Sequence, residues 1–448
     1  MKDLSSGSIP AHITSMSIQM AIGILVQTLY FFTDLYFVSK LGDSTIAGVT
    51  SAGNVWFIVL ALTQMLNVGT VALVSHAVGA QERDRANHVF NQSLLLSLLL
   101  GAIVFVGVYV ITGPYMHTVA ADEATARAGI DYLYWFAPGL ALQFIMVSMF
   151  ATLRATGMMM PTMIIQVISV AVNIFLAPVL IIGWLTGKPM GPAGAGLASS
   201  IATVVGVVLS VYYFVTHEKY VAIHGKQMEV NWPVWGRLLI IGLPVGLEFF
   251  LMSIVMAVIY WVIRDFGASA QAGFGVGQGI MRIIMLPAMA VAFASAPIAG
   301  QNYGARKPDR VRETFNWTVS FSVLIMLMLT MLCQFESDTF MRIFTSEPAV
   351  VAVGTHMLMI ISWNFAANGI IFSCSSMFQA LGNTWPSIGS SAVRLVIFIV
   401  PVLYLSTLPG FELVHVWYVS LASMFIQAVV SFVLLRREFG RKLTPVAA

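Results

Sequence analysis

The feature that most limits the fold of this chain is its series of long, uninterrupted apolar stretches, of which SLLLSLLLGAIVFVGVYVI at 93–111 is one. A bilayer core of about 30 Å is crossed by roughly 20 apolar residues in an α-helix. Membrane β-strands would instead alternate apolar and polar residues over runs of roughly ten, and this stretch does not alternate. The chain is therefore predicted to be an all-α membrane protein.

Twelve stretches of this kind predict twelve transmembrane helices. The composition agrees, because 58% of the 448 residues are hydrophobic and only 9% are charged, whereas about a quarter of an ordinary soluble domain is charged. The polar opening MKDLSSGSIPAHITS leads into a full-length span, so no cleaved signal peptide is expected. The predicted spans are 14–38, 46–75, 90–112, 130–152, 160–185, 193–216, 236–263, 272–300, 316–334, 352–378, 386–407 and 412–435.

The basic residues predict the orientation of these spans. Fifteen Lys and Arg lie in the two terminal segments and in the connections on the same side, and five lie in the opposite connections. Since Lys and Arg are retained on the cytoplasmic side, both termini are expected in the cytoplasm. The net charge of +3 is explained by this topology, and no nucleic-acid partner is expected.

The chain also repeats itself at an offset of 225 residues. SHAVGAQERDRANHVFN at 75–91 aligns without a gap with GQNYGARKPDRVRETFN at 300–316. The same register aligns DLYFVSKLGDSTIAGV with IYWVIRDFGASAQAGF, and LRATGMMMP with FQALGNTWP. The matched residues include Gly, Pro, Asp, Arg and Asn, which apolar composition alone would not align.

This repeat predicts the domain organisation. An offset of six helices returns each half in the same membrane orientation, so the halves should be related by a pseudo-two-fold axis along the membrane normal. We expect two six-helix bundles around a central cavity: an N-terminal lobe at 1–216, a cytoplasmic linker at 217–235 and a C-terminal lobe at 236–448. The doubled polar segment is then the cytoplasmic loop after the second helix of each half, where its Asp and Arg brace helix ends.

Two acidic residues inside the spans break the symmetry of the repeat. Asp34 aligns with Ile259, and Glu248 aligns with Gly23. A charged side chain in a membrane span costs about 2.5–3.5 kcal/mol on insertion scales and marks a functional site by default. The alternative for Asp34 is a carboxylate at the outer interface, satisfied by water or Lys40. The alternatives for Glu248 are a position near the cytoplasmic helix end or an ion pair with Arg282.

Other polar residues in the second half supply further candidates. Arg282, Gln278, Asn364 and Asn368 are expected, with Glu248, to form a substrate or secondary ion site. Alternatively, the amide side chains form hydrogen bonds between neighbouring helices. The alternative role of Arg282 and Arg394 is to brace the interior of the protein. GFGVGQG at 273–279 is interpreted as close helix packing rather than a nucleotide loop, because no strand precedes it.

At these residues the chain resembles the multidrug and toxic compound extrusion (MATE) family, in particular its DinF-like and archaeal branch. The resemblance covers nearly the whole chain and includes DLYFVSKLG, GLPVGLE and the GAQERDRA and GARKPDRV loops. It implies antiport of amphipathic, often cationic organic compounds, driven by H⁺ or Na⁺ and working by alternating access.

The resemblance also implies a coupling-ion site. Asp34 matches the first-helix acid of that branch, and Asn173 matches its fifth-helix amide. The branch often has an acid four residues after this amide, where Ala177 stands here. A second acid that relatives carry one turn beyond Glu248 is replaced by Met252. The absence of a carboxylate at position 177 argues against a Na⁺ site, because a hard cation is bound by several oxygen ligands. It favours proton binding by Asp34, with Asn173 as a hydrogen-bond partner.

We therefore expect a proton-coupled multidrug exporter of the cell inner membrane, acting as a monomer on small organic substrates among lipids, with no cofactor and no metal site. One rival is a lipid-linked oligosaccharide flippase, which would need more basic residues for pyrophosphate than Arg282 and Arg394 supply. Another is an intramembrane enzyme, against which the spans contain no H-E-x-x-H or G-x-S-x-G motif. A structural scaffold is the third.

Overall fold

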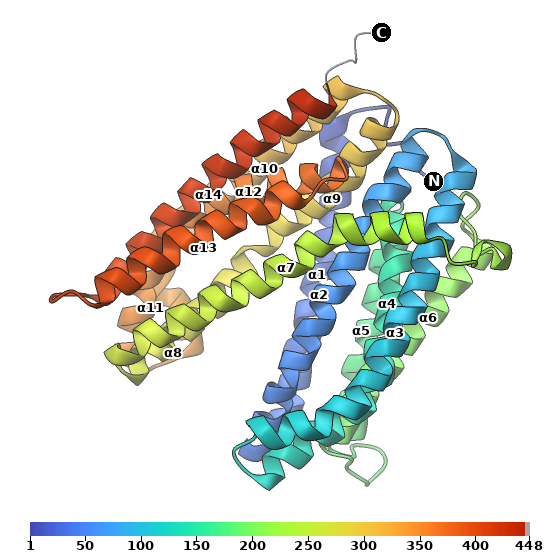
Figure 1. Cartoon of the computed structure of the whole chain (residues 1–448). Helices are drawn as coiled ribbons and strands as arrows, with labels where there is room; N and C mark the ends of the chain where they lie inside the picture. The colour runs from blue at the N-terminus through green and yellow to red at the C-terminus, as the bar shows by residue number, and fades with distance from the viewer. Residues whose placement is uncertain (444–448) are drawn as a thin grey trace. The chain divides into compact units, whose positions relative to one another are not determined.

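The computed structural model describes residues 1–443, apart from the side chain of Phe31, and in this part the chain is helical without strands. Fourteen α-helices and two short 3-10 helices make up the described chain (Figure 1). They are α1 (Ile9–Ser39), α2 (Asp43–Gly79), α3 (Arg83–Val119), α4 (Glu123–Ala155), α5 (Met159–Ile181), α6 (Pro192–Thr216), η1 (Gly225–Gln227), α7 (Trp232–Ile263), η2 (Arg264–Phe266), α8 (Ala268–Ile284), α9 (Leu286–Gly304), α10 (Pro308–Phe344), α11 (Pro348–Ile361), α12 (Asn364–Ala380), α13 (Trp385–Ser406) and α14 (Leu413–Lys442).

The prediction of an all-α, twelve-span protein is confirmed. Ten helices of the described chain are long and apolar enough to cross a membrane, and two bent helix pairs bring the number to twelve. Several helices exceed the predicted spans. The α2, α3 and α10 helices have 37 residues each, or about 55 Å at 1.5 Å per residue. Hydropathy marks only the part that suits the bilayer, and the polar ends of these helices extend beyond it.

Two spans of the second half are broken. The α8–α9 pair bends by 40° at Met285, and the α11–α12 pair bends by 53°. Pro287 in the first turn of α9 explains the first break, because proline lacks the N–H that would continue the helix. The repeat-related helices α2 and α4 are continuous, even though α4 contains Pro138. The sequence did not predict this difference.

The α11–α12 break is held by side chains of α10. The Thr330 hydroxyl donates to the Ser362 carbonyl over 2.8 Å, and the Gln334 amide donates to the Met359 carbonyl over 2.6 Å. The same amide donates to the Ser362 hydroxyl over 2.7 Å. Broken helices are tolerated at membrane depth when neighbouring groups pair the freed carbonyls. The break is therefore a formed feature of the fold.

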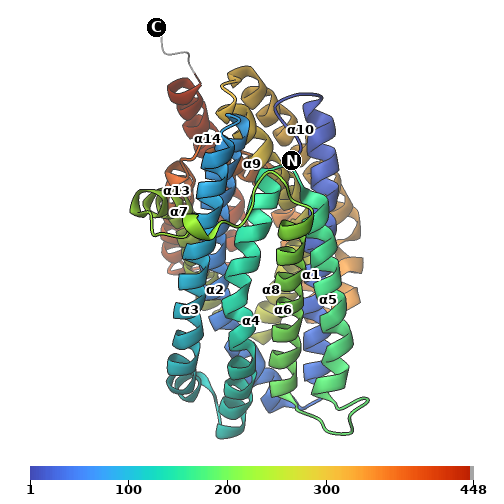
Figure 2. The same cartoon turned by 90° about the vertical axis from the view of Figure 1, so that its right-hand side faces the viewer.

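The helices gather into two compact units. Unit 1 contains residues 1–3 and 19–242, and unit 2 contains residues 4–18 and 243–448. Within unit 1, α4 packs against α2, α3 and α6, and α5 packs against α6 (Figure 2). Within unit 2, α11 and α12 together pack against α8, α9, α10 and α14, and α13 packs against α14. Each unit thus repeats the same packing order.

The units do not coincide with a simple cut at the expected 217–235 linker. The start of α1, residues 9–18, belongs to unit 2, and the rest of α1 belongs to unit 1. In the same way, α7 starts in unit 1 and passes into unit 2 after Gly242. The first helix of each half therefore begins in the unit formed by the other half. Hydropathy could not indicate this, because it identifies a helix long enough to span the membrane but not the neighbours against which each part of that helix packs.

Repeat-related glycines adopt the same backbone conformation. Gly42 has a φ of 104° and Gly267 has a φ of 89°, while Gly157 and Gly382 have φ values of 77° and 66°. These positive values are accessible to glycine at no steric cost. The glycines that align in the two halves are thus the ones that the same turns require.

The doubled polar loop supports the repeat independently. Gln81 and Arg306 are the non-glycine residues of positive φ in residues 1–443, with values of 60° and 56°. They are 225 positions apart, which is the offset of the repeat. Non-glycine residues rarely adopt positive φ, yet Gln81 and Arg306 both do so at equivalent positions of the repeat. The two loops therefore share the same turn although their residues at this position differ.

The predicted close packing of the GFGVGQG segment is confirmed. A Cβ on Gly273 would come within 2.9 Å of Val353 Cβ and 3.0 Å of the Val350 carbonyl. A Cβ on Gly277 would come within 2.9 Å of the Met357 methyl group. The missing side chains let α8 approach α11 closely, which is how small residues act at helix contacts in membranes.

Three amides of α3 hold the connection that leads to α7. Asn87, Asn91 and Gln92 are at most 5% exposed. Each uses both ends of its amide: the oxygen accepts a backbone N–H of the connection, and the nitrogen donates to its backbone carbonyls. The accepted N–H groups are those of Ala222, His224 and Asn231 at 2.8–2.9 Å, and the carbonyls are those of Tyr220, Ala222, Gln227 and Glu229 at 2.6–3.1 Å.

In unit 2, residues around the second copy of the loop bind the N-terminal segment. The Leu4 N–H donates to Gln301 Oε1 over 2.9 Å, and Asn302 Nδ2 donates to the Leu4 carbonyl over 3.1 Å. Arg310 Nη2 donates to the Gly7 carbonyl over 3.0 Å, and its Nε donates to Asn302 Oδ1 over 2.9 Å. In both units, polar side chains at or near a copy of the doubled loop therefore bind the segment that leads into a long first helix. In unit 1 this segment leads into α7, and in unit 2 it leads into α1.

Replacing Asn91 with alanine should destabilise unit 1. The change removes an amide that pairs with the His224 N–H and the Ala222 carbonyl, so we expect a loss of about 1–3 kcal/mol in the free energy of unfolding. Denaturant titration of the detergent-solubilised protein, followed by circular dichroism, measures this loss. The matched control is Asn316→Ala, since Asn316 is the repeat partner and is exposed. Equal stability of the two variants would contradict the assigned role.

Candidate functional site

Asp34 lies in α1, five residues before the helix ends at Ser39. Its side chain is half-buried within unit 1, and its Oδ1 atom is fully shielded. Tyr30 precedes it by one helical turn, so the two side chains share one face of α1. The carboxylate therefore belongs to the interior of unit 1 rather than to the polar end of the helix.

Ser199 of α6 connects the polar side chains around Asp34. The Tyr30 hydroxyl donates to Ser199 Oγ over 2.7 Å, and Asn173 Nδ2 of α5 donates to it over 3.5 Å. Ser199 Oγ lies 3.2 Å from Asp34 Oδ2 and 3.0 Å from the Ala195 carbonyl, and it is placed to donate to either. The structure thus brings together the two predicted coupling residues, Asp34 and Asn173, through a serine.

The single proton of Ser199 makes this arrangement sensitive to the state of Asp34. A serine hydroxyl donates one hydrogen bond and accepts two, and here Tyr30 and Asn173 supply the two donors. Its own proton is then shared between two acceptors, the Asp34 carboxylate and the Ala195 carbonyl. A charged carboxylate is the stronger acceptor, so an ionised Asp34 takes this proton and a neutral Asp34 leaves it to Ala195.

Two buried oxygens of the site have no protein donor among the described residues. They are Asp34 Oδ1 and Asn173 Oδ1. Asn173 is 0% exposed, so its oxygen is removed from solvent. An unpaired buried acceptor costs free energy. A proton added to Asp34 Oδ1 would turn that atom from an unpaired acceptor into a hydrogen-bond donor. Asn173 Oδ1 is the other acceptor of the site that lacks a donor among the described residues.

The position at which the resembling branch often carries a second acid is apolar and closed. Ala177 is 0% exposed and packs in a cluster with Val38, Ile181 and Ala195. Phe37 and Tyr132 border this cluster. A carboxylate at 177 would be buried among hydrocarbon, so the alanine suits a site that has one acid.

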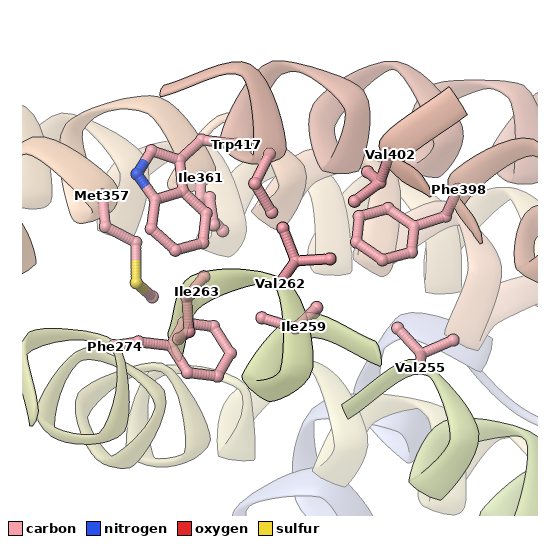
Figure 3. Packing of buried hydrophobic residues seen from close by; sticks show 11 residues of the cluster. Val255, Ile259, Val262, Ile263, Phe274, Met357, Ile361, Phe398, Val402 and Trp417 are labelled. Carbon is pink, nitrogen blue, oxygen red and sulfur yellow. The ribbon is translucent and has the colours of Figure 1, made fainter. Parts of the chain in front are cut away.

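The equivalent place in unit 2 has lost its polarity. The repeat offset relates Tyr30, Asp34, Asn173 and Ala177 to residues that all lie in one buried apolar cluster. These residues are Val255, Ile259, Phe398 and Val402. Figure 3 shows them together with Phe274 and Trp417, whose rings stack with centroids 5.7 Å apart. The same architectural position is thus a polar site in unit 1 and hydrophobic core in unit 2.

Unit 2 has a carboxylate of its own, Glu248, at a repeat position that differs from that of Asp34. Glu248 of α7 accepts from the Ser387 hydroxyl over 2.7 Å and from the Ser391 hydroxyl over 3.1 Å. Gln427 Nε2 of α14 donates to Ser391 Oγ over 3.1 Å. Ser387 lies in the first turn of α13, whose positive dipole end favours a nearby negative charge. The aligned position of Glu248 is Gly23, eleven residues or about 16 Å along the helix from Asp34.

The other predicted residues of unit 2 do not join Glu248. No ion pair links Glu248 with Arg282 in the described chain, so that alternative is not realised. Arg282 and Gln278 lie on α8, where Arg282 is exposed and Gln278 is half-buried. Asn364 and Asn368 lie at the start of α12, beyond the break, with Asn368 Nδ2 donating to the Asn364 carbonyl over 3.1 Å.

Sequence reasoning missed the hydroxyl partners of both acids. Ser199, Ser387 and Ser391 are ordinary members of small-residue runs, and no spacing identifies them. Tyr30 had a usable signal, because it precedes Asp34 by four residues and so lies on the same helical face. Only the hydrogen bonds that connect α6 with α1, and α13 with α7, identify the serines.

Comparison with known proteins relates the chain to transporters. The sequence profile of the MatE family matches residues 20–179 and 244–405, in two segments that begin 224 residues apart. The multidrug export protein MepA of Staphylococcus aureus is 27% identical over 402 residues, which cover 87% of this chain and 85% of MepA. A FAD transporter of Shewanella oneidensis is 23% identical over 408 residues, covering 90% of this chain and 89% of that protein.

The fold is also that of solved transporter structures. An outward-facing conformation of a multidrug resistance MATE family transporter of the MOP superfamily superposes with a TM-score of 0.92 at 24% identity. The superposition covers 99% of this chain and 98% of that one. The likeness shows the two-lobe, twelve-span fold.

A double-mutant cycle should show that Glu248 and Ser387 interact. Hydrogen bonds to charged groups contribute about 1.5–3 kcal/mol, so we expect a coupling of this size between Glu248→Ala and Ser387→Ala in the free energy of unfolding, because each change removes one partner of the bond. The cycle is measured by chemical denaturation of the purified protein in detergent. Additivity within about 0.5 kcal/mol, as for sites that do not touch, would rule out the interaction.

Proposed function

Because this chain belongs to the MatE family, we propose that it is a secondary active multidrug exporter, which moves amphipathic and often cationic organic compounds out of the cytoplasm in exchange for H⁺. In this proposal it works by alternating access as a monomer of the cell inner membrane, with both termini in the cytoplasm. The name of the MepA relative supports multidrug export. The name of the FAD transporter relative leaves the physiological substrate open.

The observation that carries the proposal is the divergence of one repeated position. Tyr30, Asp34 and Asn173 are polar in unit 1, while their partners in unit 2 are core residues. Polar groups in membrane spans are costly, and the hydrophobic version demonstrates that the fold packs without them. We therefore attribute Asp34 to function rather than to stability.

The coupling step that we propose is protonation of Asp34 from the outer side. The proton enters on Oδ1, which lacks a donor, and turns it into a donor for a neighbouring acceptor such as Asn173 Oδ1. Ser199 then turns its own proton to the Ala195 carbonyl. Loss of the negative charge weakens the binding of a cationic compound, which leaves outward, and loss of the proton to the cytoplasm restores the binding state.

The available oxygens favour H⁺ over Na⁺ as the coupling ion. A hard metal cation is bound by several oxygen ligands. Here Ser199 Oγ is already contacted by four groups, and the site's oxygens that have no protein donor among the described residues are Asp34 Oδ1 and Asn173 Oδ1. Ala177 contributes no further oxygen, whereas a proton needs only one acceptor.

Proton and substrate are then linked through the charge of Asp34. A compound that binds more tightly to the ionised form must weaken proton binding by the same factor, because coupling between two sites is reciprocal. Export therefore requires that the two occupants exclude one another. This exclusion makes the outward movement of the compound depend on the inward movement of H⁺.

Replacing Asp34 with asparagine should abolish export and leave folding intact. The amide oxygen still accepts from Ser199, but the side chain can no longer gain or lose a proton. Accumulation of a cationic dye such as ethidium inside everted vesicles, whose cytoplasmic face points outward, measures the loss, with thermal unfolding in detergent as the check on folding. Asp43→Asn, an exposed acid in the first turn of α2, is the control and should export normally. Normal efflux by Asp34→Asn would end the proposed mechanism.

Imposed gradients should identify the coupling ion. In proteoliposomes, we expect a pH gradient that drives H⁺ against the direction of dye movement to power transport, since one titrating carboxyl is the proposed coupling group. A Na⁺ gradient at equal pH on both sides should not. Transport that follows the Na⁺ gradient alone would refute proton coupling and leave the exporter function standing.

A further inference from the structure

Helix α14 turns its polar side chains inward and its apolar side chains outward. The polar residues in its middle are all buried, and they are Ser420, Ser423, Gln427 and Ser431. The exposed residues over the same length are all apolar, and they are Ala422, Phe425, Ile426, Val429, Phe432 and Val433. Polar groups of a spanning helix face the protein interior, and hydrocarbon surrounds its apolar outer face. The exposed face of α14 therefore contacts lipid acyl chains.

This lipid-facing surface ends in two arginines. The next exposed residues along α14 are Arg436 and Arg437. Arg437 follows Val433 by four residues and so lies on the same face of the helix. The guanidinium carbon of Arg436 lies 5.2 Å from the centroid of the Phe432 ring, one turn before it. The apolar span was predicted to end at 435, so both arginines lie within about 3 Å of that end along the helix axis, where the headgroup layer begins.

Neither arginine has a protein acceptor in the described part of the chain. Arg436 and Arg437 form no ion pair and no hydrogen bond there. The nearby carboxylate of Glu438 is buried and pairs instead with Arg441 at 3.1 Å and with Lys442 at 3.4 Å. The donors of the two guanidinium groups are thus free to bind a group from outside the protein.

The whole of this end of unit 2 is positively charged. The start of α10 lies beside the end of α14, because the rings of Phe315 and Phe439 have centroids 5.8 Å apart. Residues 306–313 and 436–442 together contain eight basic and three acidic side chains. Such an excess of positive charge at a membrane surface attracts anionic lipids.

The repeat shows that the fold does not need arginine at these positions. The offset of 225 relates Arg436 and Arg437 to Val211 and Tyr212 of α6, which are both exposed. The structure keeps this register in two equivalent ring contacts, Phe90–Phe214 and Phe315–Phe439. Basic residues in loops are enough to orient a chain in the membrane. Orientation therefore does not explain why unit 2 has two guanidinium groups where unit 1 has apolar and aromatic side chains.

We propose that Arg436 and Arg437 bind the phosphate group of an anionic phospholipid in the leaflet on this side of the membrane. The acyl chains lie along the exposed apolar face of α14. Each planar guanidinium group offers parallel N–H donors that match phosphate oxygens. A headgroup of net negative charge, such as phosphatidylglycerol, is preferred to a zwitterionic one, because the latter brings its own cation to a positive surface. This site is separate from the proposed exporter function and does not depend on the transported compound.

Native mass spectrometry of the purified full-length protein, titrated with lipid in detergent, tests the proposal. Dioleoylphosphatidylglycerol and dioleoylphosphatidylcholine have the same acyl chains and differ in the headgroup. A basic residue at the membrane surface contributes about fivefold to the binding of anionic lipid. We therefore expect Arg436→Gln/Arg437→Gln to weaken phosphatidylglycerol binding by about twentyfold and to leave phosphatidylcholine binding within about twofold. Inorganic phosphate should not displace the bound lipid.

The matched control is Lys219→Gln/Lys226→Gln, which removes two exposed charges from the connection between α6 and α7 and should change neither affinity. The converse variant, Val211→Arg/Tyr212→Arg, should add a second phosphatidylglycerol site on α6, and it decides the question if the loss variant does not fold. Unchanged phosphatidylglycerol binding in the loss variant, equal weakening by the control, or equal affinity of the wild type for both lipids would overturn the inference. Displacement of the lipid by inorganic phosphate, or a converse variant that binds no additional phosphatidylglycerol, would do the same.

Discussion

The hydrocarbon core of a bilayer offers no hydrogen-bond partner, and this constraint governs each irregular feature of the structure. The broken α11–α12 span exists because Thr330 and Gln334 pair its freed carbonyls. Ser199 donates to one oxygen of Asp34, and Ser387 and Ser391 donate to Glu248, so serine hydroxyls take the part of water at both carboxylates. Pairing is incomplete at Asp34 Oδ1, which has no hydrogen-bond partner in the described part of the chain, and this is the atom on which we propose that the coupling proton binds.

Duplication supplied the architecture, and divergence supplied the site. The turns at Gly42 and Gly267, and the unusual backbone at Gln81 and Arg306, have been kept in both halves. The interior has not: the place of Asp34 is filled by Ile259 in a closed apolar cluster. A fold that tolerates both versions can change the chemistry of one half without changing the packing of its helices.

The two units therefore differ in charge although they agree in topology. Unit 1 holds Asp34 next to Ser199, with no cation paired to it in the described chain. Unit 2 holds Glu248 among serines and exposes the unpaired Arg282 on α8.

The sequence by itself determined the number and type of the spans and the 225-residue repeat, and it singled out Asp34 as a candidate, because hydropathy, alignment and the cost of a buried charge can all be read from the residues alone. It also placed Asn173 beside Asp34 through family resemblance. Only the tertiary structure decided that Ser199 joins them, that Glu248 pairs with serines rather than Arg282, and that α1 and α7 each pass from one unit to the other. These facts depend on which helices pack together, and apolar helix faces of similar composition leave that choice to the folded chain.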